Sequence, residues 1–421
     1  MCYNYISMFS IFLLNLRTRI VVRKMNVPKL RFKEFNDEWK NIDLKNVFEY
    51  FSSNSLSRDQ LSDSGIIKNI HYGDIHRKYS TIVDVDNDVD TYIKDINYNN
   101  KYEYCKNSDL IFADASEDYE GIGKVIELNN IKCNTVSGLH TILARDKQNL
   151  FAPMFKGYYF NSPSIHNQIR ILANGFKVYG ISKDSINKLN INIPAKKEQS
   201  KIARTLYLLD KKIELQTKKI EDLKLFTFNT IKDLYNDAKC DTIKIQDIAT
   251  FYSGGTPTSS NKEFYSGTIP FIRSGEIHSC KTELYINEDA LIKSSAKMIS
   301  KGDILYALYG ATSGDVSISK ITGAINQAIL CIKPNNNINK FYLYQVLKIK
   351  KEEILKKYLQ GGQGNLSAEI IKNILIKLPS PEFQNSISKI SNDLEIKLEM
   401  EIQKLNKLIE LKKGLMQNMF V

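Results

Sequence analysis

The sequence has little of what disulfide scaffolds, metal sites or membrane spans require. Its six cysteines are scattered without a CxxC pair, and its five histidines show no metal-ligand spacing to them. A disulfide framework or a structural zinc site is therefore not expected, and free thiols fit a reducing cytoplasm. The apolar run from Ile6 to Leu16 is too short for a bilayer, which needs about 20 residues. These absences favour a cytoplasmic protein without a metal centre.

Catalytic motifs are also missing. GIGK at 121–124 resembles a phosphate-binding loop, but Asp118 replaces the first glycine and Val125 replaces the serine or threonine after the lysine. No (N/D)PP(Y/F) loop, typical of aminomethyltransferases, occurs. The residue types of a PD…ExK nuclease occur loosely in the first half, at Asp114, Glu117, Glu120 and Lys124. Because the second half has no matching set, we interpret them as a solvated loop and the chain as a binding protein.

What the sequence does contain is a long internal repeat. INIPAKKEQSKIARTLYLL at 191–209 matches IKLPSPEFQNSISKISNDL at 376–394. One offset relates the matched pairs Pro194 and Pro379, Gln199 and Gln384, and Ile202 and Ile387. Further upstream, NSDLIFADA at 107–115 pairs with KGDILYALY at 301–309. A repeat this long indicates a duplicated globular half with its own helical tail, so we expect a function that one protein performs twice.

The globular halves show short β-like runs between turn residues, with a probable helix in each. We expect an α/β (α+β) fold with a curved, mainly antiparallel sheet in each half. The predicted division is an extension at 1–24, a first globular domain at 25–195, a helix at 196–236, a second globular domain at 237–380 and a second helix at 381–421.

The two tails carry heptad seams, because their aliphatic residues recur at alternating steps of three and four. The predicted seam residues are Ile202, Leu206, Leu209, Ile213, Ile220, Leu223, Ile387, Ile390, Leu394, Leu398, Ile402 and Leu405. Such helices are hardly stable alone, so we expect them to pair as an antiparallel coiled coil related by a pseudo-twofold axis. About 38 residues at a rise of roughly 1.5 Å give a rod of roughly 57 Å. The alternative is that each helix docks only on its own domain.

The net charge of +12 is the main compositional clue. Clustered lysine and arginine bind polyanions by releasing counterions, which favours a nucleic-acid partner. An AT-rich genome, which favours lysine, asparagine and isoleucine codons, explains the same charge equally well. The charge alone does not decide between these explanations.

The first residues suggest an over-extended reading frame. Met25 opens MNVPKLRFKEFNDEWK, which is typical of a natural protein start, whereas 1–24 has neither a basic start nor a cleavage site of a secretory signal. We therefore predict that translation begins at Met25. The intact mass of the native protein tests this, and a species retaining Met1 would contradict it.

Several segments together resemble the specificity subunits of bacterial type I restriction–modification systems. They are VPKLRFKEFNDEWK at 27–40, FYSGGTPTSSNKEFYSGTIPFIRSGEI at 251–277, IPAKKEQSKIARTLYLLDKKIELQTKKIEDLK at 193–224 and LPSPEFQNSISKI at 378–390. The resemblance runs from Val27 to the C-terminus in the expected order, with the expected duplication. The second copy departs at Phe383, where the family pattern implies a glutamate before Gln384.

This resemblance implies a non-catalytic subunit with two target-recognition domains. Each would read one half of a bipartite double-stranded DNA site, while the paired helices fix the gap and dock two methyltransferase subunits. Restriction subunits would join through the complex. S-adenosylmethionine, ATP and Mg²⁺ would belong to those partner subunits, and this chain would bind no cofactor. Half-sites one helical turn apart lie roughly 34–36 Å from each other, which suits a rod of the predicted order.

Candidate base-reading residues are polar side chains in loops beside glycines, because such loops approach DNA closely. The candidates are His71, Tyr72, Lys78, Asn174, Lys177, Tyr179, Arg273, Ser274, Tyr309, Thr312, Gln360, Gln363 and Asn365. These loops differ between the halves, which predicts an asymmetric target. Lysines on the helices, such as Lys211 and Lys218, are more consistent with a solvated face or a partner surface.

Two other functions remain open from the residues. A coiled-coil scaffold joining acidic partners would explain the helices and the charge, but not the divergent glycine loops. A self-sufficient restriction nuclease or methyltransferase would need the motifs that are missing. Neighbouring genes for a methyltransferase and a helicase would distinguish these alternatives.

Overall fold

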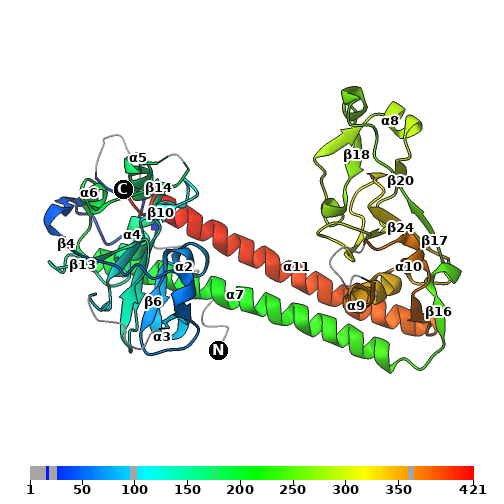
Figure 1. Cartoon of the computed structure of the whole chain (residues 1–421), viewed down its shortest axis with the longest axis horizontal. Helices are drawn as coiled ribbons and strands as arrows, with labels where there is room; N and C mark the ends of the chain where they lie inside the picture. Colours follow the sequence, from blue (N-terminus) through cyan, green and yellow to red (C-terminus); the bar gives the residue numbers. More distant parts are fainter. Residues whose placement is uncertain (1–15, 19–25, 95–101, 176, 359–364) are drawn as a thin grey trace. The chain divides into compact units, whose positions relative to one another are not determined.

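The structure is a computed structural model that describes the chain except for residues 1–15, 19–25, 95–101, 176 and 359–364. The chain divides into two compact units. The first comprises 1–217 together with 404–421, and the second comprises 218–403. Each of the long helices contributes to both units, so each unit consists of one globular domain and parts of both helices (Figure 1).

The first globular domain is built on two sheets that are mostly antiparallel. The five-stranded sheet has the order β4 (Phe48–Phe51), β13 (Thr141–Asp146), β9 (Leu110–Ala113), β11 (Val125–Asn129) and β7 (Ile82–Asp84). The four-stranded sheet has the order β12 (Thr135–Ser137), β6 (Lys68–Ile70), β8 (Tyr92–Ile93) and β5 (Leu61–Ser62).

Short strand pairs and helices complete this domain. The antiparallel pairs are β1 (Leu16–Thr18) with β2 (Leu30–Phe32), β3 (Lys40–Asp43) with β15 (Asn190–Ile193), and β10 (Ala115–Ser116) with β14 (Tyr179–Gly180). The helices are α2 (Tyr72–Arg77), α3 (Val85–Asp88), α4 (Phe155–Phe160), α5 (Pro163–Leu172) and α6 (Lys183–Asn187), with 3₁₀ turns η1 (Leu44–Asn46) and η2 (Arg58–Gln60).

The second globular domain has the same plan. One sheet has the order β17 (Ala249–Ser253), β24 (Ile329–Pro334), β21 (Ile304–Ala307) and β22 (Val316–Ile318). The other has the order β19 (Leu284–Ile286), β18 (Ile269–Ile272), β23 (Gly323–Ile325) and β20 (Lys297–Ile299), while β16 (Thr242–Lys244) pairs with β25 (Leu375–Lys377). The helices are α8 (Glu288–Lys293), α9 (Lys340–Tyr358) and α10 (Ala368–Lys372), with 3₁₀ turns η3 (Ile245–Asp247), η4 (Lys262–Tyr265) and η5 (Ser274–Glu276).

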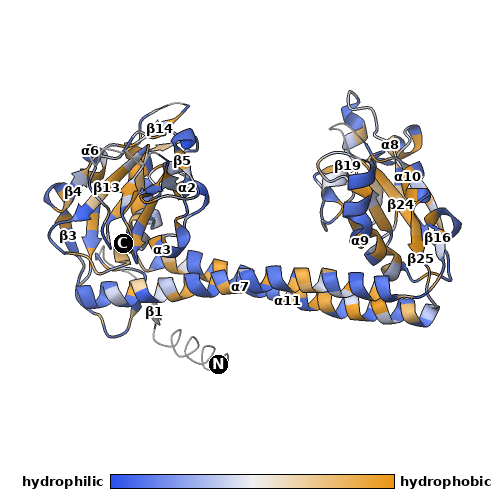
Figure 2. Cartoon of the chain, turned by 60° about the horizontal axis from the view of Figure 1, so that its bottom comes forward, coloured by the Kyte–Doolittle hydropathy of each residue, from blue (hydrophilic) through white to orange (hydrophobic). Residues whose placement is uncertain are grey.

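The topology of the two domains confirms the duplication. The order β4-β13-β9-β11 in the first domain corresponds to β17-β24-β21-β22 in the second. The pairing of β6 with β12 is parallel, as is the pairing of β18 with β23. Both central strands β9 and β21 are buried along their whole length, which explains their continuous apolar sequences LIFA and ILYA. Figure 2 shows the apolar strands β13 and β24 within their domains.

Individual buried contacts repeat as well. Tyr159 on α4 donates its hydroxyl to the carbonyl of Asn192 over 2.8 Å, and Tyr342 on α9 donates to the carbonyl of Lys377 over 2.8 Å. In each case a tyrosine hydroxyl from a helix of the domain donates a hydrogen bond to a backbone carbonyl of the strand that precedes a long helix. A buried tyrosine needs such a partner, so the same solution is retained in both copies.

The long helices are α7 (Lys196–Asp237) and α11 (Pro381–Asn418). A buried glutamine in the first turn ties each one to its domain. Gln199 accepts a hydrogen bond from the backbone N–H of Ala152 at 2.8 Å and donates to the carbonyl of Pro194 at 2.9 Å. Gln384 accepts from the N–H of Asn339 at 2.9 Å and donates to the carbonyl of Pro379 at 2.9 Å. The glutamine shared by the two sequence repeats is therefore a structural clamp.

The helices run antiparallel where they meet within each unit. In the first unit Lys412 of α11 pairs with Asp210 of α7 at 2.6 Å, and in the second Lys219 of α7 pairs with Glu401 of α11 at 3.0 Å. Residue numbers rise along one helix as they fall along the other, which confirms the predicted antiparallel coiled coil. In Figure 2, α7 and α11 alternate apolar and polar segments, as a seam requires.

The predicted seam needs one correction, at Ile390. Its side chain is 40% exposed, and Ser391 is fully buried in its place. From Ile387 to Leu394 a heptad seam can pass through Ile390, in steps of three and four, or through Ser391, in steps of four and three. The prediction chose the more apolar residue, Ile390. The other predicted seam residues are buried or half-buried: Ile202, Leu206, Leu209, Ile213, Ile220, Leu223, Ile387, Leu394, Leu398, Ile402 and Leu405.

The end of α11 completes the core of the first unit. Leu415, Met419 and Phe420 belong to the same buried cluster as the strands of the first domain. The ring of Phe420 lies 5.7 Å from that of Tyr159 and 6.0 Å from that of Phe155, measured between centroids. The first unit therefore takes its core from two distant stretches of the sequence. In the second unit, Ile231 and Tyr235 of α7 and Ile387 of α11 join the core.

A buried ion pair distinguishes the first copy from the second. Arg31 donates from Nε and one Nη to both carboxylate oxygens of Glu198, each at 2.7 Å, and both residues are buried. Phe383 occupies the matching position of the second copy and packs against the apolar core of that unit. The glutamate is thus paired within the chain by Arg31 of β2, near the N-terminal end of the first domain.

Replacing Glu198 with alanine should destabilise the first unit by about 3–5 kcal/mol, because the Arg31 guanidinium would stay buried without its counter-charge. Hydrogen exchange in the first turns of α7, together with thermal unfolding, measures the effect. The control is Glu34→Ala, which removes the ion pair with Lys201 at a half-exposed site and should cost at most about 1 kcal/mol. Equal effects of the two substitutions would contradict this assignment.

Candidate nucleic-acid interface

The two candidate recognition loops begin at equivalent strands. In the first domain β6 leads into His71-Tyr72-Gly73-Asp74, and in the second β18 leads into Arg273-Ser274-Gly275-Glu276. Both segments turn at once into a short helix, α2 in the first domain and η5 in the second. The repeat therefore places different side chains on the same scaffold position in the two domains.

His71 and Tyr72 form an aromatic cluster with two further histidines. The Tyr72 ring lies 4.7 Å from His71, 5.2 Å from His140 and 6.2 Å from His76, between ring centroids. Burial holds the pKa of His71 below its ordinary value, and its Nδ1 accepts a hydrogen bond from the N–H of Gly73 at 3.1 Å. A neutral His71 is consistent with that acceptor role, because a protonated ring has no free lone pair.

The segment carrying Asn174, Lys177 and Tyr179 lies close to this cluster. Strand β14, which contains Tyr179, pairs with β10, and the carbonyl of Ala115 in β10 lies 3.0 Å from Nε2 of His76. Asn174 exchanges two backbone hydrogen bonds with Gly180, while its side chain and that of Lys177 are exposed. Strand β10 thus brings together two predicted loops that are distant in sequence.

Lys78 lies apart from these loops in its contacts. It forms an ion pair with Asp90 on the exposed surface of the domain. Its ammonium group also lies 5.8 Å from the centroid of the Tyr79 ring. Among the described residues, its ion-pair partner is Asp90 and not a member of the aromatic cluster.

In the second domain, Arg273, Ser274, Tyr309 and Thr312 lie on two neighbouring loops. The Ser274 hydroxyl lies within 4.0 Å of where a β-carbon on Gly310 would stand, between Tyr309 and Thr312. Both Gly310 and Gly314 have positive φ, which only glycine adopts without strain, so this loop turns tightly. Asn365 is exposed beside Leu366, whose N–H donates to the carbonyl of Leu308 at 3.0 Å.

Two predicted residues, Gln360 and Gln363, lie outside the described residues. The contacts of Gln360 and Gln363 stay a prediction.

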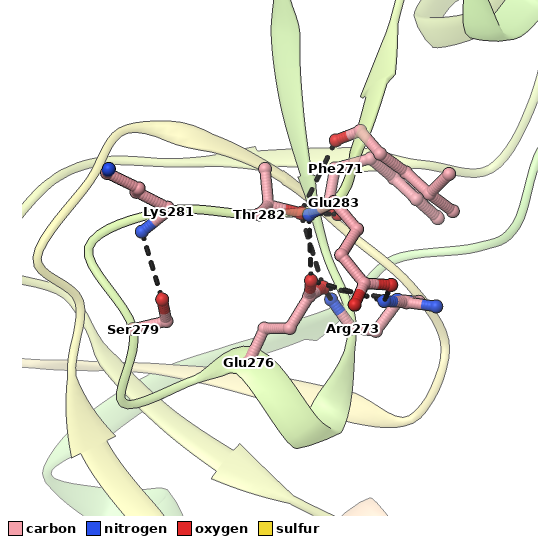
Figure 3. A network of polar contacts seen from close by, with 8 residues as sticks. Phe271, Arg273, Glu276, Ser279, Lys281, Thr282 and Glu283 are labelled. Carbon is pink, nitrogen blue, oxygen red and sulfur yellow. Dashed lines mark hydrogen bonds and ion pairs between the residues drawn. The ribbon is translucent and has the colours of Figure 1, made fainter. Parts of the chain in front are cut away.

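Arg273 lies in the centre of a polar network (Figure 3). Its Nε donates to Oε2 of Glu276 at 3.1 Å, one Nη donates to Oε1 at 3.2 Å, and the same Nη donates to Glu283. Burial raises the pKa of Glu276, but the hydrogen bonds from Arg273 and from the N–H of Glu283, with the charge of Arg273, together hold the pKa of Glu276 below its ordinary value. Arg273 is thus a fixed, charged donor at the surface, with 41% of its side chain exposed.

Sequence reasoning missed a second such arginine, Arg58 of η2. Its two Nη groups donate to Asp74 at 2.9 and 2.7 Å, and about half of its side chain is exposed. Asp74 and Glu276 occupy the same position of the repeat, in IHYGDIH and IRSGEIH. The shared acid was a visible signal, whereas nothing in the sequence connected Arg58 with it.

Two of the three acids considered for a nuclease, and the lysine, are engaged in other contacts. Asp114 lies 3.3 Å from Nδ1 of His140, and Glu120 pairs with Arg170. The ammonium of Lys124 donates to the carbonyl of His76 at 3.2 Å. Within the described ranges, no group of three or more His, Cys, Asp or Glu side chains is arranged to hold a metal ion. No helix in the part of the chain that the structure describes could cross a membrane.

Comparisons with known proteins match both halves. The family described as type I restriction modification DNA specificity domain matches twice, at residues 36–225 and 238–411. The MjaIX specificity subunit of Methanocaldococcus jannaschii is 30% identical over 178 residues, which are 40% of this chain and 41% of that protein. The HindI specificity subunit of Haemophilus influenzae is 24% identical over 395 residues, covering 71% of this chain and 85% of the relative.

A solved structure shares the fold over nearly the whole chain. The S subunit of a type I restriction–modification system from M. genitalium has a TM-score of 0.58 at 17% identity, covering 94% of this chain and 99% of that one. The two sequence matches coincide with the two globular domains and most of their helices. The chain therefore belongs to the type I restriction modification DNA specificity family.

Proposed function

We propose that this chain is the DNA-recognition subunit of a type I restriction–modification complex and acts in the cytoplasm. Each globular domain reads one half of a bipartite, asymmetric site in double-stranded DNA. The chain itself carries no catalytic chemistry, and methylation and cleavage belong to partner subunits that it docks. The observation that carries this proposal is the duplicated scaffold whose loops differ at equivalent positions, Tyr72 against Ser274 and His71 against Arg273.

The net charge and the side chains of the loops support DNA as the partner. The net charge of +12 favours binding to a polyanion, and the contribution of phosphate contacts falls as salt concentration rises. Base reading requires hydrogen-bonding side chains held in a fixed geometry, which the loops after β6 and β18 supply. A scaffold for acidic proteins would not require different loops in the two copies.

The long helices support a second role, that of a spacer. Lys196–Asp237 forms one uninterrupted helix, which at roughly 1.5 Å per residue is roughly 60 Å long. A rigid helix pair fixes the number of base pairs between the two half-sites without contacting those bases. The same pair docks the methyltransferase subunits in this proposal.

Exposed apolar side chains on the helices support protein docking. Leu215 on α7 is 68% exposed and Met400 on α11 is 54% exposed. These two residues occupy equivalent positions of the sequence repeat. Large apolar side chains on the outer face of a coiled coil add nothing to the pairing of the helices. A partner protein that covered them would bury their apolar surface.

Genome-wide adenine methylation mapping tests the recognition role. Deleting the gene should abolish methylation at one bipartite motif, because the methyltransferase subunits would lose their DNA-reading partner. Complementation with the intact gene should restore the same motif. Unchanged methylation in the deletion strain, when the complemented strain methylates a bipartite motif, would contradict the proposal.

Matched insertions in both helices test the spacer. Seven residues after Thr217 and seven between Glu399 and Lys404 add two turns, roughly 10 Å, and preserve the heptad phase. The accepted gap should grow by about one to three base pairs, at 3.4 Å each, with unchanged half-sites. The control is the same seven residues at exposed Lys239, beyond the end of α7. A methylated motif with the original gap would contradict the spacer role.

Charge substitutions test the docking surface. Leu215→Glu and Met400→Glu should each reduce co-purification of the methyltransferase subunit at least tenfold, because a carboxylate would be buried at the interface. Thermal unfolding should stay unchanged, since both side chains are exposed. The matched control is exposed Lys218→Glu on α7. Undiminished co-purification of both variants would place docking elsewhere.

A further inference from the structure

In both globular domains a carboxylate at the same position of the sequence repeat binds an arginine. Asp74 holds Arg58 in the first domain, and Glu276 holds Arg273 in the second. The two arginines come from unrelated places, since Arg58 precedes β6 and Arg273 follows β18 directly. The acid is therefore the retained element, and each copy supplies its own arginine to it.

In the second domain the acid is itself held rigidly. Besides the Arg273 guanidinium, Glu276 accepts hydrogen bonds from the N–H of Arg273 at 3.1 Å, the N–H of Glu283 at 2.9 Å and the hydroxyl of Thr282 at 3.2 Å. Only 15% of its side chain is exposed. A carboxylate with this many donors has little freedom, so it fixes the plane of the guanidinium that it binds.

The second carboxylate on Arg273 differs in kind. The Glu283 side chain is 78% exposed and contacts only the outer Nη of the arginine. Among the described residues, the other Nη group of Arg273 has no hydrogen-bonding partner. The outer fork of Arg273 is therefore partly covered by a side chain that can swing away at little cost, while its inner edge stays bound to Glu276 (Figure 3).

Charge identifies the ligand of this fork. Arg273 with Glu276 and Glu283 carries a net charge of about −1, which disfavours a phosphate group. The N7 and O6 atoms of guanine are neutral acceptors with the spacing of an arginine fork, and this is the commonest specific contact in the major groove. A guanine edge would replace the Glu283 carboxylate without adding negative charge.

We propose that Arg273 reads a guanine in the half-site of the second domain, that Glu276 is its positioning residue, and that Glu283 covers the fork until DNA displaces it. The Arg58–Asp74 pair shares the position of the acid in the first domain, but both Nη groups of Arg58 hold that acid, so the proposal is made for Arg273 alone. This inference rests on the proposed function, because it requires that the domain reads DNA. It specifies which side chain reads which base edge.

The test uses the full chain with its methyltransferase partner and the DNA motif found by methylation mapping. Each guanine of the second half-site is replaced in turn by 7-deazaguanine, which lacks the N7 acceptor. The wild type should lose affinity about 10- to 100-fold at one guanine. Arg273→Ala should bind the normal and the 7-deaza DNA equally, and Lys293→Ala, at an exposed side chain of α8, should discriminate like the wild type.

The two glutamates should behave differently. Glu276→Gln should lose discrimination against 7-deazaguanine while its affinity for random-sequence DNA stays equal or rises, since a negative charge is removed. A structural defect would lower both affinities. Glu283→Gln should keep the discrimination and bind the target more tightly, because the competing carboxylate is weakened.

The outcomes separate this inference from the proposed function. A wild-type complex that binds no bipartite motif refutes the proposed function. A complex that binds its motif but tolerates 7-deazaguanine at every position, or whose Arg273→Ala variant still discriminates, overturns only the role of Arg273. The role of Arg273 would also be overturned if the Arg273→Ala substitution abolished the loss of affinity caused by a neutral methylphosphonate in place of one phosphate, but not the loss caused by 7-deazaguanine.

Discussion

A buried glutamine in the first turn of each long helix ties that helix to its own globular domain. Gln199 and Gln384 each connect the backbone before the domain's helix, the proline that ends the last strand and the long helix itself. All of the groups that they bind are backbone atoms. A buried amide that lost these partners would leave several polar groups unsatisfied, each costing about 1–3 kcal/mol. The same buried side chain thus anchors the start of the helix in both copies.

Contacts to backbone atoms are repeated in the two copies, whereas contacts between side chains differ. The tyrosine and glutamine contacts are the same in both domains because any sequence supplies a backbone carbonyl or N–H. The Arg31–Glu198 pair has no second copy, since it needs two specific partners. In the recognition loops the two copies share an acid, Asp74 or Glu276, whereas the arginine that it binds comes from a different place in each copy. Divergence of the loops therefore leaves the scaffold intact.

The sequence repeat and the helical periodicity were sufficient to predict the two domains, the two long helices and their antiparallel pairing. They failed at Ile390, because periodicity selects apolar residues and cannot see that Ser391 fits the buried position. The candidate loops after β6 and β18 were also predictable, from their glycines and polar side chains.

The partners of the loop residues were not predictable. Arg58 reaches Asp74 only after η2 and α2 fold against each other, and Glu283 reaches Arg273 across a turn between β18 and β19. Such pairings depend on the path of the backbone in three dimensions. The residue type of a loop position predicts which hydrogen-bond donors and acceptors it has. Only the fold determines whether another side chain of the protein already binds them.

The contact of Phe420 with Tyr159 and Phe155 has a consequence for biosynthesis. The first unit needs residues 404–421, which the ribosome makes only after the whole second unit. At 5–20 residues per second this delay is on the order of ten seconds or more. Throughout that interval the nascent first domain exposes an aromatic face, so chaperones have time to bind it. The order of assembly is then second unit before first, the reverse of the order of translation.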